Sequence, residues 1–211
     1  MKKPFVIAID GASSTGKSTL AKGLAKALGF PHVDSGAMYR GVTLYVQQHG
    51  LIENKKVKTE TLLSQLDDIH LRFEGDTFWL NGVDVSAEIR SMQVSEAVSL
   101  VAAIPEVRTF LVAQQRIMGA NQSVVMDGRD IGTVVFPKAD IKLFLTADVN
   151  IRAQRRFDEL SAQNTLTSVA EVRNNLAERD HLDSTRAESP LVQAADAIVL
   201  DATQYLSLIH I

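Results

Sequence analysis

A glycine-rich loop follows the first apolar run of the chain and constrains its fold more than any other segment. The run Phe5–Ile9 leads through Asp10 into Gly11–Ser18, whose sequence GASSTGKS fits the pattern G-x-x-x-x-G-K-[ST]. A helical run, Thr19–Leu28, comes next and is closed by Gly29. In a strand, loop and helix of this order, the loop N–H groups and the positive end of the helix point at one anion. The sequence therefore predicts a loop that binds a nucleoside triphosphate.

Lysine and serine at the end of this loop carry the expected chemistry. Lys17 brings a mobile cation to the β- and γ-phosphates, and the Ser18 hydroxyl is placed to ligate Mg²⁺, which is the expected cofactor. The two glycines let the backbone turn tightly enough to aim several N–H groups at one phosphate. The residues expected to contact ATP form one continuous segment: Gly11, Ala12, Ser13, Ser14, Thr15, Gly16, Lys17, Ser18 and Thr19.

Composition and charge exclude several classes of protein. With a net charge of −3, the 211 residues lack the basic stripe of a nucleic-acid-binding protein, and the absence of cysteine excludes disulfides and thiolate chemistry. The apolar run that ends at Asp10 is too short for a signal peptide, and no stretch approaches the roughly 18 apolar residues of a membrane span. We therefore expect a cytoplasmic protein that binds small molecules, not nucleic acid or membrane. Since no exposed apolar stripe stands out, we expect a monomer.

Short apolar segments separated by helical stretches indicate an α/β fold. Five of them read as buried parallel strands: Phe5–Ile9, Phe30–Val33, Ser123–Met126, Ile141–Thr146 and Ala197–Leu200. We expect a three-layer P-loop NTPase fold with a five-stranded parallel sheet. Such sheets bind ligands at the carboxyl ends of their strands. Acidic residues follow three of the expected strands at that edge: Asp10, Asp34 and Asp127.

The segment Asp68–Val85 departs from this pattern. Three short alternating runs, Ile69–Phe73, Thr77–Leu80 and Val83–Val85, are separated by turn signals that include Asn81-Gly82. We expect a small antiparallel sheet, inserted between the second and third core strands, whose Phe78 and Trp79 form a minor core and not a stacking platform. Two helices should follow it, over Met92–Ala103 and Glu106–Gly119, on either side of Pro105.

Clusters of arginine and aspartate indicate what the nucleotide is used for. Asp34–Arg40 and Asp127–Asp130 each come directly after an expected strand. Two further clusters have helical spacing, and each therefore shares a helix face: Arg152, Arg155 and Arg156, and Arg179, Asp183 and Arg186. Arginine binds phosphate oxygens bidentately and keeps its charge. Transfer of a phosphoryl group between two anionic substrates needs such groups, because negative charge spreads over the transferred oxygens.

Three of these segments resemble the bacterial cytidylate kinase family. They are DSGAMYR at Asp34–Arg40, DGRDIGTVVFP at Asp127–Pro137, and the pattern E-R-D-x-x-D-x-x-R from Glu178 to Arg186. The resemblance extends over residues 5–203 in order and includes the small sheet insert. It implies transfer of the γ-phosphoryl group of ATP to CMP or dCMP, giving ADP and CDP or dCDP. It also implies one kinase domain over residues 1–211, with an NMP-binding insert at 35–100 and a short lid at 149–168.

The resemblance also implies roles for individual residues. Arg40, Arg129 and Arg186 would hold the CMP phosphate, and Ser35 would lie at the same site. Tyr39, Arg179 and Asp183 would face the sugar, with Asp127 beside them. Ser99, Arg108 and Asp130 would read cytosine. The groups expected to act on the transferred phosphoryl are Lys17, Arg129, Arg152, Arg155 and Arg156, the last three on a lid that closes over ATP.

An acid and an arginine suit cytosine for an independent reason. Cytosine presents an amine donor beside two acceptors, and a carboxylate is a familiar partner of that amine. Uracil exchanges donor and acceptor at two of these positions, so buried polar groups built for cytosine would be mismatched. The expected base-reading residues therefore predict rejection of UMP.

Two other functions remain open from the residues alone. One is a kinase of the same architecture for another small acceptor, such as UMP or a non-nucleotide alcohol, although neither acceptor suits the base-reading residues. A regulatory module in which ATP only switches conformation would keep the loop, but it would not need the lid or acceptor arginines. The scattered histidines His32, His49, His70 and His181 are expected to have no catalytic role.

The last residues of the chain differ from the family pattern. The family continues past the final strand into a helix, whereas Ser207–Ile211 has no capping residue and no amphipathic period long enough for one. We expect this end to be a truncation or a foreign sequence, with more effect on stability than on chemistry.

Overall fold

The computed structural model describes residues 3–162 and 166–204. It divides into two compact units: one comprises Met1–His32 with Gln122–Ile211, and the other comprises Val33–Asn121. We call them the phosphate-loop unit and the insert unit, and each is described by itself. The expected lid therefore includes residues, 163–165, that lie outside the described part, and so does the unusual end Ser207–Ile211.

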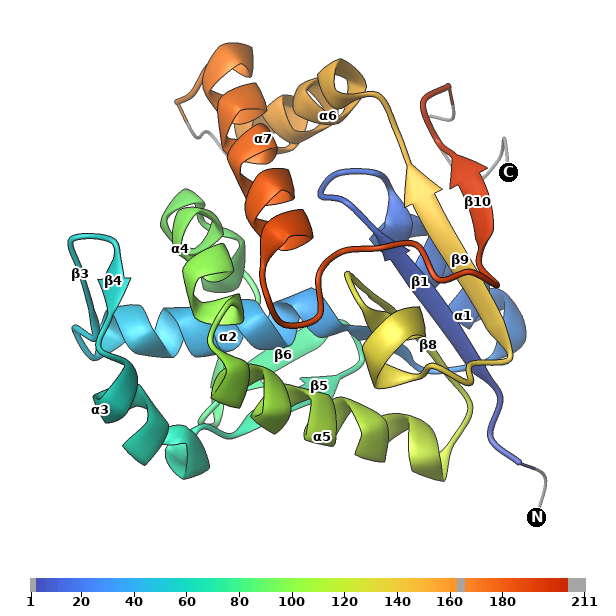
Figure 1. Cartoon of the computed structure of the whole chain (residues 1–211), viewed down its shortest axis with the longest axis horizontal. Helices are drawn as coiled ribbons and strands as arrows, with labels where there is room; N and C mark the ends of the chain where they lie inside the picture. The colour runs from blue at the N-terminus through green and yellow to red at the C-terminus, as the bar shows by residue number, and fades with distance from the viewer. Residues whose placement is uncertain (1–2, 163–165, 205–211) are drawn as a thin grey trace. The chain divides into compact units, whose positions relative to one another are not determined.

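The largest sheet has five strands in the order β10-β9-β1-β8-β2 (Figure 1). Its strands are β1 (Val6–Gly11), β2 (His32–Asp34), β8 (Val124–Gly128), β9 (Ile141–Thr146) and β10 (Ile198–Asp201). β1 pairs in parallel with both β8 and β9, and β9 pairs in parallel with β10. All five strands expected from the sequence are present, with bounds that differ from the expected ones by at most two residues. The expectation that each is buried is wrong for β10, where Ile198 and Val199 are 59 % and 47 % exposed, because β10 is the last strand in the sheet order.

In its described residues, the phosphate-loop unit has three α-helices and one π-helical turn. They are α1 (Lys17–Leu28), α6 (Val149–Ala162), α7 (Val169–Thr185) and η3 (Ile131–Val135). The apolar face of α1 packs on the sheet with Ile7, Ile9, Val125 and Leu145. α6 and α7 pack against each other (Figure 1).

Helices dominate the insert unit, and two small sheets accompany them. The helices are α2 (Ser35–Gln48), α3 (Thr59–Ser64), α4 (Met92–Ala102) and α5 (Pro105–Asn121), with short 3₁₀ turns at Leu66–Asp68 and Glu88–Arg90. The strands are β3 (Ile52–Glu53), β4 (Lys56–Val57), β5 (Leu71–Glu74), β6 (Thr77–Leu80) and β7 (Val83–Asp84). The antiparallel order β5-β6-β7 confirms the expected sheet, and the two helices after it are confirmed as well.

The insert unit also contains elements that the sequence pattern did not predict. β3 and β4 form a hairpin whose turn residues, Asn54 and Lys55, have φ angles of 49° and 58°. Turns with positive φ at both central residues usually have the sequence Asn-Gly. Here lysine stands in place of the glycine, so the usual sequence signal for the hairpin is absent. Phe78 is 3 % exposed and belongs to the unit's apolar core, whereas Trp79 is half-buried with the Arg72 guanidinium 5.3 Å from its ring centroid.

Among residues 3–162 and 166–204, no helix has the length and apolar character that a membrane span requires.

Candidate active site

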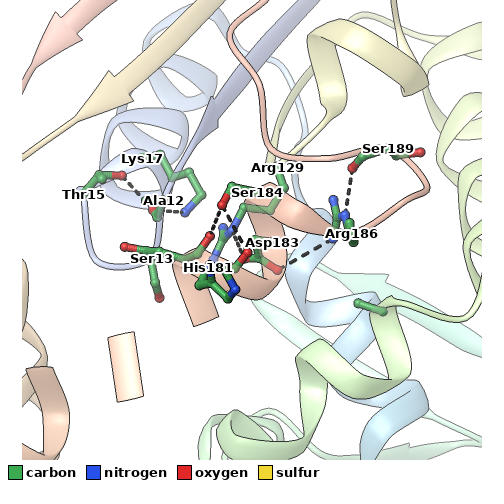
Figure 2. Close-up of polar contacts among 12 residues, drawn as sticks. Ala12, Ser13, Thr15, Lys17, Arg129, His181, Asp183, Ser184, Arg186 and Ser189 are labelled. Carbon is green, nitrogen blue, oxygen red and sulfur yellow. Dashed lines mark hydrogen bonds and ion pairs between the residues drawn. The ribbon is translucent and has the colours of Figure 1, made fainter. Parts of the chain in front are cut away.

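In the loop between β1 and α1, two side chains donate hydrogen bonds to the same backbone carbonyl. The Ala12 carbonyl accepts hydrogen bonds from the Lys17 Nζ at 2.9 Å and from the Thr15 hydroxyl at 3.1 Å (Figure 2). Gly16 caps α1 with a φ of 94°, a region that favours glycine. At Gly11, a Cβ would lie 2.3 Å from the Leu145 carbonyl oxygen, so only glycine fits beside β9. The motif glycines are therefore required by the backbone path.

The loop serine reaches a buried carboxylate at the end of the neighbouring strand. The Ser18 hydroxyl donates to Asp127 Oδ2 at 2.6 Å, and Asp127 is 1 % exposed. Parallel pairing of β1 with β8 sets Ile9 opposite Asp127 and so brings the end of β8 to the loop. A hydroxyl and a carboxylate are the hard oxygen ligands that suit Mg²⁺, which usually takes one or two protein ligands with substrate phosphates and water. The residues present therefore fit the expected cofactor.

The same carboxylate has a second partner. His32 Nε2 lies 2.7 Å from Asp127 Oδ1, and the two side chains are 14 % and 2 % exposed. No local sequence signal connects His32 with the loop, because 95 residues separate it from Asp127. Its place on β2, one strand beyond β8 in the sheet, is the tertiary feature that brings the two side chains together.

Two of the expected lid arginines contact carbonyls of the phosphate loop. Arg152 is 7 % exposed; its guanidinium donates to the Ser13 carbonyl at 3.2 Å and to Asp180 Oδ2 at 2.6 Å. Arg155 donates to the Thr15 carbonyl at 3.5 Å. α6 therefore holds both arginines beside the loop, and Asp180 on α7 is a partner that the sequence analysis did not identify.

Arg156, the third lid arginine, and the second hydrogen bond of Arg155 involve groups outside the phosphate loop. Arg156 pairs with Glu159 on its own helix at 3.0 Å. Arg155 also donates to the Ala202 carbonyl at 2.7 Å, just beyond β10. The three arginines thus share α6, as their spacing predicted, but Arg152 and Arg155 contact the loop, whereas Arg156 pairs along the helix.

Two of the arginines expected to hold the acceptor phosphate converge on one carboxylate. Arg129 Nε donates to Asp183 Oδ2 at 2.9 Å, and Arg186 Nη1 lies 3.7 Å from Asp183 Oδ1 (Figure 2). Burial by itself would raise the pKa of Asp183, but Arg129, Arg186 and Arg179 lower it overall. Likewise, burial would lower the pKa of Arg129, and Asp183 raises it. Asp183 stays ionised and holds two cationic side chains in place.

Asp10, at the end of β1, shapes the segment that carries these residues. Its two carboxylate oxygens accept the backbone N–H groups of Ile131 and Gly132, each at 2.7 Å. These groups open the π-helical turn that follows Asp127–Asp130. Asp130 itself is 3 % exposed. Burial raises the pKa of Asp10 to about 6, although both backbone bonds act in the opposite direction.

In the insert unit, the start of α2 fixes one acceptor arginine. The Asp34 carboxylate accepts the Ala37 N–H at 3.0 Å as a helix cap and pairs with Arg40 at 2.7 Å. Burial opposes ionisation of Asp34, but Arg40 outweighs it and lowers the pKa of that carboxyl to about 2. A Cβ at Gly36 would lie 2.9 Å from the Arg40 Nη1, so glycine leaves room for the guanidinium.

The expected base-reading arginine is also held in the insert unit. Arg108 on α5 is 4 % exposed, donates to the Ala102 carbonyl at 3.2 Å and lies 5.3 Å from the Tyr39 ring centroid. Ser99 lies on the same helix, α4, as Ala102 and is 7 % exposed. The structure therefore brings Arg108 together with Tyr39, another residue expected at the CMP site.

The CMP-site residues predicted from the sequence are divided between the units. The insert unit holds Ser35, Tyr39, Arg40, Ser99 and Arg108, and the phosphate-loop unit holds Asp127, Arg129, Asp130, Arg179, Asp183 and Arg186. Within each unit, most of them have buried or paired side chains. Their assembly into one CMP site stays a prediction.

The family model that matches this chain and two similar relatives carry the same family description. A family model described as cytidylate kinase matches residues 7–211. A cytidylate kinase from Parabacteroides distasonis is 54 % identical over 206 residues, covering 94 % of this chain and 90 % of that protein. One from Bacteroides fragilis is 50 % identical over 205 residues, with the same coverage. Among solved structures, an uncharacterized protein from Eubacterium ventriosum has a TM-score of 0.50 at 14 % identity over 95 % of this chain and 91 % of that chain, a likeness in fold alone.

Proposed function

Because the chain belongs to the cytidylate kinase family, we propose that it transfers the γ-phosphoryl group of ATP to CMP or dCMP, giving ADP and CDP or dCDP. The observation that carries the proposal is the convergence of Arg129 and Arg186 on Asp183, in the same unit as the phosphate loop. A module that only binds ATP needs the loop but has no use for a second pair of preorganised guanidinium groups. A kinase with two phosphorylated substrates needs the loop for ATP and these arginines for the phosphate of the acceptor.

In the proposed mechanism, positioning and charge supply the catalysis. The loop N–H groups and Lys17 hold the β- and γ-phosphates, and Arg129 stabilises charge on the transferred oxygens. The attacking atom is an oxygen of the CMP phosphate, which is already an anion, so no general base is required. Ser18 and Asp127 would hold Mg²⁺, which when bound neutralises charge on the β- and γ-phosphates.

The arginines of α6 would limit hydrolysis. Arg152 and Arg155 link α6 to the Ser13 and Thr15 carbonyls of the loop. As part of a lid over residues 149–168, they would cover the triphosphate and exclude water. This arrangement favours transfer to the acceptor over transfer to water.

Base selection would depend on Ser99, Arg108 and Asp130. Arg108 and Asp130 are 4 % and 3 % exposed, so a mismatched base would leave a desolvated polar group without its partner. Sites built on such hydrogen bonds reject the wrong substrate strongly. We therefore expect activity with CMP and dCMP to exceed activity with UMP.

The test is ADP release from Mg·ATP by the purified chain, with CMP, dCMP, UMP, AMP, GMP or no acceptor. A rate that appears only with the cytidine nucleotides supports the proposal. A rate with UMP or a non-nucleotide alcohol would indicate another kinase of this architecture. Acceptor-independent hydrolysis, or ATP binding without turnover, would instead favour a regulatory module. The monomeric state and the cytoplasmic location stay predictions; light scattering after size-exclusion chromatography tests the first.

A further inference from the structure

The side chain of His32 is connected to the phosphate loop through one buried carboxylate. Asp127 Oδ1 lies 2.7 Å from His32 Nε2, and Asp127 Oδ2 accepts the Ser18 hydroxyl at 2.6 Å. Each oxygen of a carboxylate that is 1 % exposed is thus engaged by a different partner. Three elements contribute: β2 carries His32, β8 carries Asp127, and α1 carries Ser18.

We propose that His32 is a positioning residue for the cofactor end of the site: it orients the Asp127 carboxylate so that the other oxygen meets Ser18. A carboxylate can rotate about its Cβ–Cγ bond, and one anchored oxygen removes that freedom. Because an ionised carboxylate only accepts hydrogen bonds, Nε2 of the imidazole carries the proton. Partners that orient ligating groups in this way commonly change metal affinity or activity by 10–100-fold when they are removed. The inference rests on the proposed function for its Mg·nucleotide site.

The backbone beside His32 is suited to this role. The Pro31 carbonyl accepts the Val125 N–H at 3.0 Å, which ties the chain just before His32 to β8 two residues before Asp127. Proline fixes its own φ and limits the preceding residue. His32 therefore approaches Asp127 from a strand and not from a loop, and its imidazole is 14 % exposed.

A purely structural role would give a different pattern. If the pair only stabilised the edge of the sheet, its loss would weaken the fold. The affinities for metal-free nucleotide, metal-bound nucleotide and CMP would then fall to a similar extent. If it orients Asp127, its loss should act mainly on the part of nucleotide binding that depends on Mg²⁺. The ratio of ADP affinities with and without Mg²⁺ separates these cases and requires no turnover.

The experiment measures ADP binding by calorimetry, in Mg²⁺ and in EDTA, for wild type, His32→Leu, His32→Gln and His32→Asn. Gln places its amide nitrogen near the position of Nε2, whereas Asn is shorter and does not. We expect His32→Leu and His32→Asn to lose about 10-fold in Mg·ADP affinity with metal-free ADP within about 2-fold of wild type, and His32→Gln to recover most of the loss. His49→Leu is the control, because His49 makes a comparable 2.8 Å hydrogen bond to the Tyr45 carbonyl in the insert unit.

Three results would overturn the proposal: unchanged Mg·ADP binding in His32→Leu, equal losses with and without Mg²⁺, or Gln no better than Asn. If His32→Leu does not fold, the polar pair Gln and Asn still decides the question. A coupling measurement in the Ser18→Ala background adds a check, since His32→Leu should then have little further effect. Because ADP binding needs no acceptor, failure of the chain to phosphorylate CMP would refute the proposed function and leave this result intact.

Discussion

The two units of the molecule bury very different side chains. Among the described residues, the phosphate-loop unit buries these charged ones: Asp10, Lys17, Asp127, Asp130, Lys142, Arg152 and Asp183. The insert unit, over the same described part of the chain, buries Arg108 as its charged residue and otherwise packs apolar side chains such as Met38, Leu62 and Leu111, each 0 % exposed. The phosphate-loop unit therefore buries mainly groups expected to act on substrates, whereas the insert unit buries mainly side chains that stabilise its fold.

This difference separates catalysis from stability. Charges taken out of water are unfavourable unless they are paired, and the pairs in the phosphate-loop unit, such as Arg129 with Asp183 and Arg152 with Asp180, provide those partners. The insert unit gains free energy from its apolar core, and Arg108 lies against the Tyr39 ring of that core. We therefore expect changes in the first unit to act mainly on turnover, and changes in the second mainly on folding.

The largest effect on turnover should come from Lys17→Ala. Loss of this cation removes stabilisation of the developing phosphoryl charge, and we expect kcat to fall by about 10²–10³-fold or more. Steady-state assays give kcat, and circular dichroism checks the fold. Lys22→Ala, on an exposed position of the same helix, is the control and should keep near-normal turnover. Near-normal turnover in Lys17→Ala would contradict the assignment of the phosphate loop.

The converse change, Leu62→Ala, should damage folding and spare chemistry. Leu62 is 0 % exposed in the insert core, so truncation should lower the free energy of unfolding by about 2–5 kcal/mol. Urea unfolding measures the loss, and kcat per folded molecule should stay near the wild-type value. Leu63→Ala, at a half-buried position of the same helix, should cost less. An equal loss for both variants would contradict the larger contribution expected from the fully buried Leu62.

Asp10→Asn tests how the phosphate-loop unit tolerates a buried carboxyl. The pKa of Asp10 is raised from 3.8 to about 6, so the folded protein binds this proton more tightly than the unfolded chain does. Its stabilising effect is complete below about pH 4 and is lost as pH rises through about 6. The stability of wild type relative to Asn should therefore fall by up to about 3 kcal/mol between pH 4 and 7.

Urea unfolding at several pH values between 4 and 7.5 measures that difference. Asp67→Asn, at an exposed carboxylate of the insert unit, controls for the change of charge. A wild-type to Asn difference that does not vary with pH would remove the assigned role of burial at Asp10.

The smallest expected effect concerns base choice. Asp130→Ala removes the carboxylate assigned to the cytosine amine, so the preference for CMP over UMP in kcat/KM should fall by about 10-fold. Competition between the two nucleotides measures the preference directly. Asp67→Ala, at an exposed position of the insert unit, is the control. Unchanged selectivity would contradict the base-reading role of Asp130, which would then be a buried carboxyl with another function in its unit.

The parts of the fold with local signals could be predicted from the sequence. Gly11–Ser18 predicted the phosphate loop, apolar runs predicted the five core strands, and Asn81-Gly82 with its flanking alternation predicted the antiparallel insert. These signals depend on neighbours a few residues apart, so tertiary packing did not change them. The β3–β4 hairpin and the π-helical turn gave no such signal. The turn exists because Asp10, 121 residues away from Ile131, accepts two of its N–H groups.

The sequence by itself determined the chemistry of this protein: a phosphate loop with its lysine and serine, and arginines in number and spacing suited to a second phosphate. Only the tertiary structure decided which charges meet. Asp127 lies between Ser18 and His32, Asp183 pairs with Arg129, and Asp180 holds Arg152. The physical reason is that a charge buried in a low-dielectric interior needs a partner within hydrogen-bond distance. Strand order and helix packing, not spacing along the chain, determine which group fills that place.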